Sequence, residues 1–176
     1  SDNMKMALAT THIALKEVPE AIDSGLLIET IEIIEKDMQV FFDLKKPTIG
    51  VLGLNPHAGE EGLLGKEELL IIEPTIEYLR KKNKNIIGPI SADTAFLQNL
   101  DLDIILALYH DQGLPLFKFV NPHQAANVTL GLPIIRTSVD HGIALDLTAS
   151  NNVNNESLHY ALMTAKKMYQ SYAEKN

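Results

Sequence analysis

The sequence predicts an α/β fold in which helices flank a mostly parallel or mixed β-sheet. Short apolar runs, of the length expected for strands buried on both faces, alternate with longer segments of helical periodicity. No apolar run approaches the roughly 18 residues of a membrane-spanning helix. The chain has 176 residues, of which 45% are hydrophobic, and this is enough for one substantial core. We therefore expect a single α/β domain over residues 1–176.

In the first third of the chain, the pattern predicts two strands and one long helix. The first strand is expected at Met6–Ala9. Asp23 and Ser24 are residue types that cap helices, and they precede a helix expected at Leu26–Phe42. The apolar face of this helix consists of Leu27, Ile31, Ile34, Met38 and Phe41. Thr48–Leu54 follows as the second strand.

The middle of the chain is expected to continue the alternation. Lys66–Asn83 has a mostly helical pattern with a break or kink at Pro74, because proline lacks an amide hydrogen. Ile86–Ile90 is a short extended segment, and Ser91–Thr94 opens a short helical turn. The unbroken apolar run Ile104–Leu108 predicts a strand buried on both faces.

The last third is expected to contain a turn, further extended segments and one helix. Gly113 and Pro115 argue for a turn rather than a long helix after the strand. An alternating stretch begins at Asn127, and Ile134–Val139 predicts another strand. The final amphipathic helix is expected at about Glu156–Tyr172.

Four of the six histidines follow closely after a predicted strand: His12, His57, His110 and His141. One histidine at such a place is usually a hydrogen-bonded loop residue. Four are expected to converge on one rim, because ligands of open parallel sheets bind outside the carboxyl ends of the strands. Three neutral imidazoles that leave coordination positions open suit catalytic zinc or a similar divalent ion. The spacing alone does not decide which three would bind.

Composition excludes several classes of function. The formal charge of -8 argues against general affinity for nucleic-acid phosphates or anionic membranes. The absence of cysteine excludes disulfides and thiolate chemistry, and we expect a soluble cytoplasmic protein. Glycines near the second strand match neither G-x-G-x-x-G nor the P-loop, so both nucleotide fingerprints are rejected.

Four motifs occur in order: Ala9-Thr10-Thr11-His12, Gly53-Leu54-Asn55-Pro56-His57-Ala58-Gly59-Glu60, Tyr109-His110-Asp111-Gln112-Gly113, and Gly131-Leu132-Pro133 leading to Arg136-Thr137-Ser138-Val139-Asp140-His141-Gly142. In this combination the chain closely resembles the 4-hydroxythreonine-4-phosphate dehydrogenase family of pyridoxal phosphate biosynthesis. The resemblance covers nearly the whole chain. Because family members are nearly twice as long, it implies that this sequence is their C-terminal half. The N-terminal half, which completes the family's two-domain cleft, is then absent, so the resemblance does not imply hydride transfer by this chain alone.

The resemblance implies a divalent metal, zinc, magnesium or cobalt, held by His12, His57 and His110. It leaves His141 a structural or supporting role, in which Asp140 would orient the ring. In the family the active site is shared between the subunits of a homodimer, with metal ligands from both. The segments present here, including the C-terminal helix, are therefore expected to carry the metal site and the dimer interface.

Substrate contacts of the family map to Lys118, Asn127 and Arg136, although Asn127 is also a residue type common in turns. Lys118 and Arg136 would supply the positive charge that an anionic, phosphorylated substrate needs on an acidic protein. Asp93 and Asp111 match family carboxylates close to the metal and substrate. The resemblance leaves open whether Asp93, Asp111 or Lys118 handles the proton of the substrate alcohol.

The implied reaction oxidises 4-phosphohydroxy-L-threonine with NAD or NADP to a β-keto acid, which decarboxylates to 3-amino-2-oxopropyl phosphate. The resemblance also implies an isocitrate or isopropylmalate dehydrogenase-like fold, which binds NAD without G-x-G-x-x-G. Alternatives within the enzyme class are paralogues that oxidise 4-phospho-threonate or 4-phospho-erythronate. A metal-dependent hydrolase or lyase would use the same histidines without NAD. A non-catalytic dimerisation fragment would turn over no substrate at all.

Overall fold

The computed structural model describes residues 1, 4–97, 100–122, 124–140 and 155–175. Its strands are β1 (Met6–Leu8), β2 (Ile49–Leu52), β3 (Ile86–Ile90), β4 (Ile104–Ala107), β5 (Ala126–Thr129) and β6 (Arg136–Val139). Its α-helices are α1 (Val18–Ala21), α2 (Ser24–Phe41), α3 (Glu73–Lys81), α4 (His110–Val120) and α5 (Glu156–Ala173). Shorter helical segments are η1 (Leu15–Glu17), η2 (Pro56–Gly62) and η3 (Glu68–Ile72). None of the helices described here is long and apolar enough to cross a membrane.

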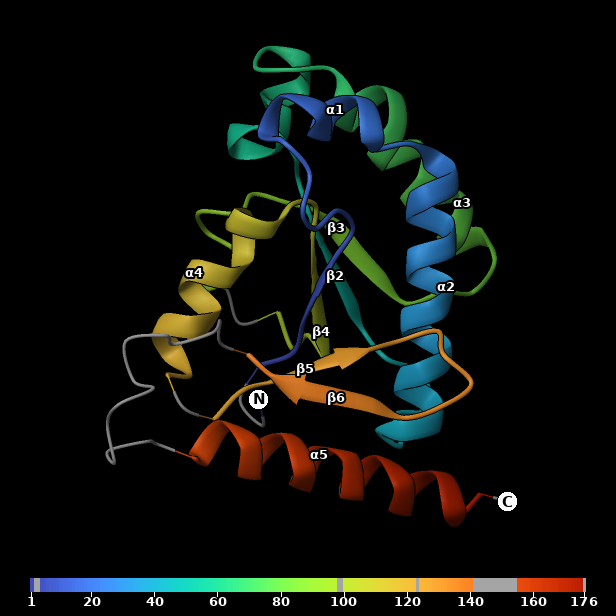
Figure 1. The fold of residues 1–176 in the computed structure, drawn as a ribbon. Helices are drawn as coiled ribbons and strands as arrows, with labels where there is room; N and C mark the ends of the chain where they lie inside the picture. The colour runs from blue at the N-terminus through green and yellow to red at the C-terminus, as the bar shows by residue number, and fades with distance from the viewer. Residues whose placement is uncertain (2–3, 98–99, 123, 141–154, 176) are drawn as a thin grey trace, which may run out of the picture.

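Four strands form one parallel sheet in the order β1-β4-β2-β3 (Figure 1). Strand β4 lies inside it, where Ile105 pairs with Met6 of β1 and Ile104 pairs with Ile49 of β2. Strands β5 and β6 form a separate antiparallel pair. The predicted α/β class with a parallel sheet is therefore confirmed, and the carboxyl ends of four strands meet at one edge.

The core lies on both faces of this sheet. Along β4 the side chains alternate, so Ile104 and Leu106 join a large cluster with α2 and α3. Ile105 and Ala107 point the other way, into a smaller cluster. Burial on both faces explains why the run from residue 104 to residue 108 contains no polar residue.

Helix α2 confirms the predicted cap and most of the predicted apolar face. The Asp23 side chain accepts a hydrogen bond from the amide of Leu26 at 2.7 Å. The buried apolar residues of the helix are Leu27, Ile31, Ile34 and Met38. Phe41 is only partly buried, and its ring lies 6.2 Å from that of Tyr172 in α5.

The turn expected after β4 is wrong, because this segment forms helix α4 with Pro115 inside it. Proline removes one helical hydrogen bond here but leaves the other turns intact. Gly113 is explained by packing: a Cβ there would collide with the Met6 side chain and come within 3.2 Å of the Ala107 Cβ. Close approach of helix to sheet therefore accounts for a glycine that suggested a turn.

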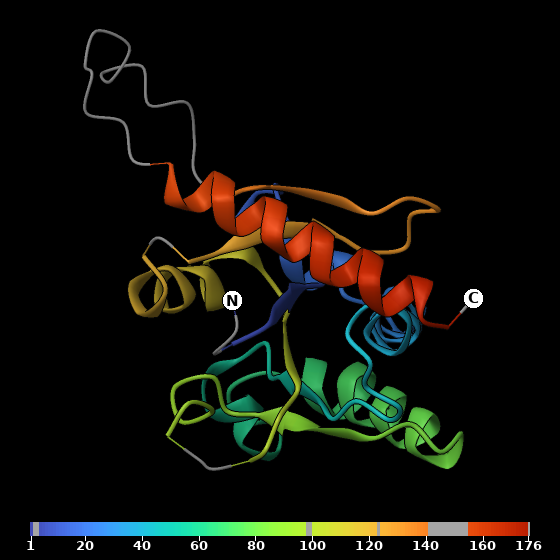
Figure 2. The ribbon, with the colours of Figure 1, turned by 90° about the horizontal axis from the view of Figure 1, so that it is seen from below.

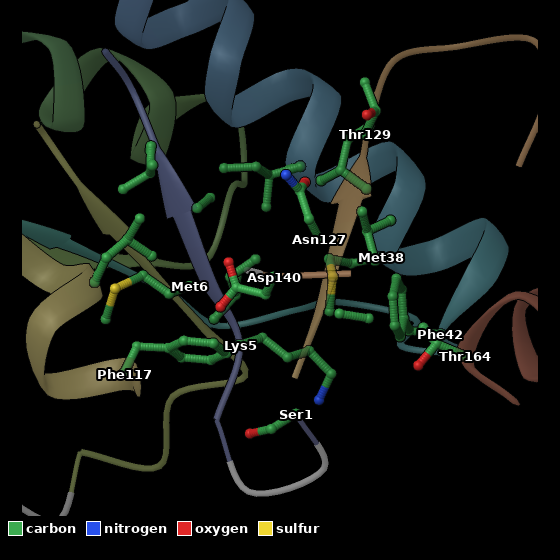
Figure 3. Close-up of a pocket in the computed structure, with 18 of the residues that line it drawn as sticks. Ser1, Lys5, Met6, Met38, Phe42, Phe117, Asn127, Thr129, Asp140 and Thr164 are labelled. Carbon is green, nitrogen blue, oxygen red and sulfur yellow. The ribbon is translucent and has the colours of Figure 1, made fainter. Parts of the chain in front are cut away.

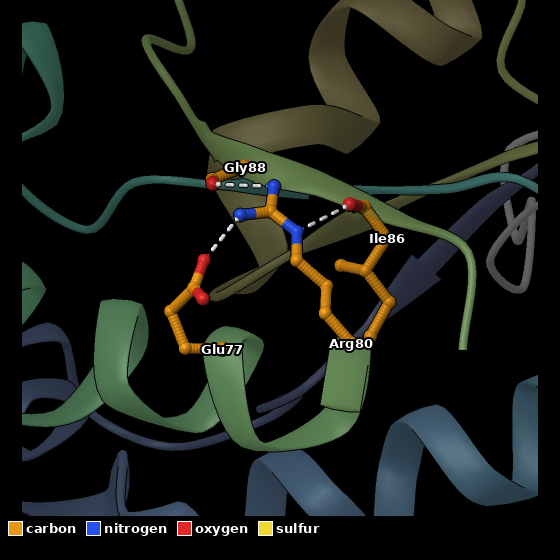
Figure 4. Close-up of polar contacts among 4 residues, drawn as sticks. All are labelled: Glu77, Arg80, Ile86 and Gly88. Carbon is orange, nitrogen blue, oxygen red and sulfur yellow. Dashed lines mark hydrogen bonds and ion pairs between the residues drawn. The ribbon is translucent and has the colours of Figure 1, made fainter. Parts of the chain in front are cut away.

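Helix α3 begins at Glu73, and Pro74 stands in its first turn, directly after another helical segment. The preceding segment, η3, is a π-helix that passes directly into α3. The helix type therefore changes next to Pro74, where a break or kink was predicted, but the helical run is not interrupted. At the other end of α3, Arg80 reaches across to strand β3 (Figure 4). Its guanidinium donates to the carbonyls of Ile86 at 3.0 Å and Gly88 at 3.4 Å and pairs with Glu77. These bonds cover carbonyls of a strand at the sheet edge.

Helix α5 lies across the β5–β6 hairpin and contacts α2 (Figure 2). The expected strand at residues 134–139 is shorter and begins at Arg136. The turn of the hairpin is fastened to α2, because the buried Asp37 carboxylate accepts a hydrogen bond from the amide of Gly131 at 2.7 Å. The hairpin and α2 therefore form one wall beside the parallel sheet.

Candidate metal and substrate site

The strand-end histidines lie along the carboxyl edge of the sheet, as their sequence positions predicted. His12 follows β1, His57 follows β2, and His110 begins the helix that follows β4. Asp93 lies in the turn that follows β3. The parallel topology explains this gathering, because it brings four successive strand tails to the same edge. His141 lies outside the described residues.

His12 and His110 are neighbours at this edge. Their ring centroids are 5.5 Å apart, with an angle of 43° between the ring planes. The Nδ1 atom of His110 lies 2.7 Å from Oδ1 of Asp111. In the tautomer that donates from Nδ1 to this carboxylate, the Nε2 lone pair is available to a metal. Asp111 therefore orients a candidate metal ligand.

His57 has a different partner. Its Nδ1 atom lies 3.6 Å from Oδ2 of Asp93, and both side chains are more than half exposed. The pKa of Asp93 is lowered, first by the hydrogen bond that the Ser91 hydroxyl donates to its Oδ1 atom at 2.5 Å. The neighbouring His57 ring lowers the pKa of this carboxyl further. The carboxylate thus stays charged beside a histidine at neutral pH.

The donor set suits a divalent metal, but the described part of the chain does not complete a site by itself. Two neighbouring imidazoles at a strand-end edge are the ligand type and placement that a catalytic metal requires. Among the described residues, however, no group of three or more His, Cys, Asp or Glu side chains is close enough to hold a metal ion. A third imidazole ligand would have to be brought to His12 and His110 from outside the arrangement of side chains that the structure describes.

A cavity of about 700 Å³ opens beside the histidine pair. His12, His110, Lys118 and Asn127 all line it, so four predicted site residues share one space. Figure 3 shows Asn127 from the hairpin and Asp140 around this cavity. The Lys118 ammonium donates to the Asp140 carbonyl at 3.2 Å and lies 3.5 Å from its carboxylate. Asn127 lies in strand β5, not in a turn.

Four predicted site residues do not line this cavity, and one of them, Asp111, contacts the His110 ring. His57 and Asp93 form their own pair and do not line the cavity. Arg136 is exposed, and its guanidinium donates to the Thr129 hydroxyl at 2.7 Å. These two residues pair across the antiparallel hairpin, so the contact follows directly from the strand register.

The backbone around His57 is left-handed. Four non-glycine residues have positive φ angles: His57 at 52°, Ala58 at 52°, Glu60 at 43° and Glu61 at 55°. Each such residue costs roughly 1–2 kcal/mol of backbone strain. A sequence pattern for a glycine-containing loop does not reveal this conformation. Contacts from outside the loop must therefore stabilise it.

Two side chains that sequence reasoning left without a role link the histidine-bearing tails. The Thr10 hydroxyl donates to the Leu108 carbonyl at 2.7 Å, which joins the tails of β1 and β4. The Gln112 side chain accepts from the Leu108 amide at 2.7 Å and donates to the Gly53 carbonyl at 2.6 Å. It thereby joins the tails of β4 and β2. Gln112 belongs to the Tyr-His-Asp-Gln-Gly motif, and this motif is the feature of the sequence that could have pointed to its role.

These features place the chain in a class of α/β proteins in which histidines at the ends of parallel strands lie beside a cavity lined by a lysine. The family model described as "Pyridoxal phosphate biosynthetic protein PdxA" matches residues 1–165, so the chain belongs to this family. The 4-hydroxythreonine-4-phosphate dehydrogenase of Ectopseudomonas mendocina is 54% identical over 94% of this chain and 50% of its own length. The chain thus spans about half the length of the curated relatives it matches.

Solved structures agree with this assignment. The chain matches a putative 4-hydroxythreonine-4-phosphate dehydrogenase from Salmonella typhimurium with a TM-score of 0.84 and 36% identity, over 96% of this chain and 52% of that one. It also matches a terephthalate 1,2-cis-dihydrodiol dehydrogenase from Burkholderia xenovorans, with a TM-score of 0.75 and 28% identity, over 92% of this chain and 52% of that one. Family and fold are therefore supported by independent comparisons.

Replacing Gln112 with alanine is expected to lower the free energy of unfolding by about 1–3 kcal/mol, because the buried Leu108 amide and Gly53 carbonyl lose their partner. Urea denaturation followed by circular dichroism measures this change. Gln170→Ala, at an exposed position of helix α5, is the matched control and should change stability by less than about 0.5 kcal/mol. Equal effects of both substitutions would contradict the linking role.

Replacing Ser91 with alanine is expected to raise the pKa of Asp93 toward the ordinary aspartate value. The hydroxyl bonds to the charged carboxylate, so its loss disfavours the charged form. A titration of the carboxyl carbon by NMR measures this shift. The serine control is Ser171→Ala, whose hydroxyl donates to the Val40 carbonyl and which should leave the Asp93 pKa unchanged. An unaltered pKa in the Ser91 variant would show that another group lowers it.

Proposed function

We propose that this chain supplies the metal- and substrate-binding half of a 4-hydroxythreonine-4-phosphate dehydrogenase that acts in pyridoxal phosphate biosynthesis in the cytoplasm. The observation that carries the proposal is the pair His12 and His110 opening onto a cavity with Lys118 and Asn127. The family match over residues 1–165 supports the same activity. The substrate would be 4-phosphohydroxy-L-threonine, and NAD or NADP would accept the hydride.

His12 and His110 of one chain, with His57 of a second copy, would hold the metal. The neighbouring pair supports this assignment, and among the described residues no group of three or more His, Cys, Asp or Glu side chains could hold a metal without a second copy. Zinc, magnesium or cobalt, when bound, supplies Lewis acidity that favours the alkoxide and later the enolate. Asp111 holds the His110 ring through Nδ1 and so directs Nε2 toward the ligand position.

The reaction needs a base, a hydride acceptor and positive charge for the substrate. The hydroxyl proton would pass to Asp93, Asp111 or Lys118 while the carbinol C–H bond breaks and its hydride passes to the nicotinamide. The resulting β-keto acid then loses carbon dioxide by cleavage of the bond to its carboxylate, and the carbon left behind takes up a proton to give 3-amino-2-oxopropyl phosphate. Lys118, which lines the cavity, would neutralise the anionic substrate.

Asn127 would donate its side-chain amide to the substrate from the hairpin wall of the cavity. Arg136 would join it after its guanidinium leaves Thr129. For the dinucleotide we propose the isocitrate dehydrogenase type of binding, since the chain lacks G-x-G-x-x-G.

Sharing of ligands between two copies predicts complementation between two inactive variants. His57→Ala and His110→Ala chains, each left with two of the three ligands, are each expected to bind zinc too weakly to retain it after dialysis. When they are mixed and reassembled, half of the dimers are heterodimers, each with one complete site. Elemental analysis after dialysis against limiting zinc should then give about a quarter of the wild-type metal content.

Reassembly of each variant alone is the control for this complementation. If the mixture binds no more zinc than the separate variants, the three histidines do not form a site shared between subunits. Light scattering at high concentration that detects only monomers would also contradict the shared site.

Substrate choice is tested by turnover with a panel of compounds. With the family's N-terminal half supplied, we expect NAD-dependent oxidation of 4-phosphohydroxy-L-threonine. Lys118→Ala should lower it about 100-fold or more, as expected for a lost charge-assisted contact of roughly 3 kcal/mol. Lys166→Ala, at an exposed position of helix α5, is the matched control. Preferred turnover of 4-phospho-threonate or 4-phospho-erythronate would identify a paralogue. The 28% identical dihydrodiol dehydrogenase shows that proteins of this fold can act on a different substrate.

Two further outcomes of this panel would replace the proposal. Turnover that does not need NAD would indicate a metal-dependent hydrolase or lyase. Metal binding without any turnover would indicate a dimerisation module.

A further inference from the structure

Glu68 is a buried carboxylate to which neither the sequence motifs nor the proposed reaction assigns a role. It begins η3, eleven positions after His57 in the chain, and its exposed fraction is 1%. Burying a carboxylate is costly unless several donors compensate for the lost water.

Both carboxylate oxygens bind the segment that leads into His57. Oε1 accepts hydrogen bonds from the backbone amides of Leu54 at 2.7 Å and Asn55 at 2.8 Å. Oε2 accepts a hydrogen bond from the Asn55 side-chain amide at 2.8 Å. Three donors from two adjacent residues thus converge on one carboxylate, and only Pro56 separates these residues from His57.

The chain also closes around Glu68 from both ends of the loop. A Cβ at Gly53 would lie 3.2 Å from Oε1, and a Cβ at Gly59 would lie 2.7 Å from Oε2. Gly59 has a φ of 82°, inside the left-handed run that contains His57. Glycine at these two positions therefore lets the loop pass close to the carboxylate on either side of His57.

We propose that Glu68 is the positioning residue of His57, which fixes the left-handed loop and hence the place where the imidazole meets the metal. The proposal rests on the proposed function, in which His57 is a ligand. The carboxylate itself is enclosed by Leu54, Asn55 and the two glycines, so it acts through the loop and does not bind the metal.

The test is Co²⁺ affinity of the Glu68→Gln variant, measured by calorimetric titration of the purified protein. Glutamine keeps the shape but replaces one acceptor oxygen with a donor, so one of the three hydrogen bonds becomes a clash of donors. We expect affinity to fall about 10- to 100-fold, as for other residues that orient metal ligands. Glu67→Gln is the matched control: Glu67 accepts from the same Asn55 amide at 2.7 Å but is only partly buried, and we expect a change below about threefold.

A double-mutant cycle with His57→Ala separates positioning from general stability. If Glu68 acts through His57, Glu68→Gln should not lower Co²⁺ affinity further when His57 is already alanine. The visible absorption spectrum of bound Co²⁺ should also change in Glu68→Gln, because the geometry of its ligands changes. Equal losses of affinity in both backgrounds would overturn the positioning role and leave a structural one.

If thermal unfolding shows that Glu68→Gln is not folded, the Glu68→Asp variant is measured in its place. It keeps the charge but is shorter by one methylene, so it cannot reach all three donors, and wild-type affinity in this variant would overturn the inference. Failure of the inference and of the proposed function are distinguishable. If His57→Ala lowers Co²⁺ affinity but the Glu68 variants do not, only the inference fails. If His57→Ala binds Co²⁺ like wild type, His57 is not a ligand and both fail.

Discussion

Parallel hydrogen bonding among β1, β4, β2 and β3 is the constraint on which the rest of the structure depends. An antiparallel partner anywhere in this sheet would send one of the tails to the opposite edge. Because all four strands run the same way, residues far apart in the chain reach one edge with no dedicated contact between them. Side-chain hydrogen bonds from Thr10 and Gln112 then fix how the ends of these strands lie relative to one another. Topology brings the histidines to the edge, and a few polar bonds refine their positions.

In this acidic chain, carboxylates are stabilised by backbone amides as well as by cationic side chains. Asp37 and Glu68 are the buried carboxylates of the described residues, and both accept hydrogen bonds from peptide N–H groups. Neither has a lysine or arginine partner among the ion pairs of the described residues. Amide donors have fixed geometry, so these carboxylates fasten a hairpin turn and a loop in definite positions. Lys118, beside the cavity, pairs with Asp140, which also lines it.

The sequence predicted much of the fold and part of the site. Apolar runs locate strands, and parallel topology then places His12, His57 and His110 at one edge, so these positions follow from local patterns. Helix α4 was missed because glycine and proline were interpreted as local signals for a turn. Gly113 is instead required by its close packing against Met6 of another element. The pairing of His57 with Asp93 depends on loop conformation, and the burial of Glu68 depends on long-range packing. No periodicity in the sequence encodes either of them.

The left-handed loop around His57 has a consequence for how this region tolerates substitution. Exposed positions usually accept almost any residue, because a new side chain there meets only water. Glu60 and Glu61 are exposed, yet their φ angles of 43° and 55° disfavour β-branched side chains. Valine or isoleucine would therefore be depleted at these two positions among functional variants, whereas asparagine and glycine would be accepted. In this loop, backbone handedness and not solvent exposure limits the range of permitted residues.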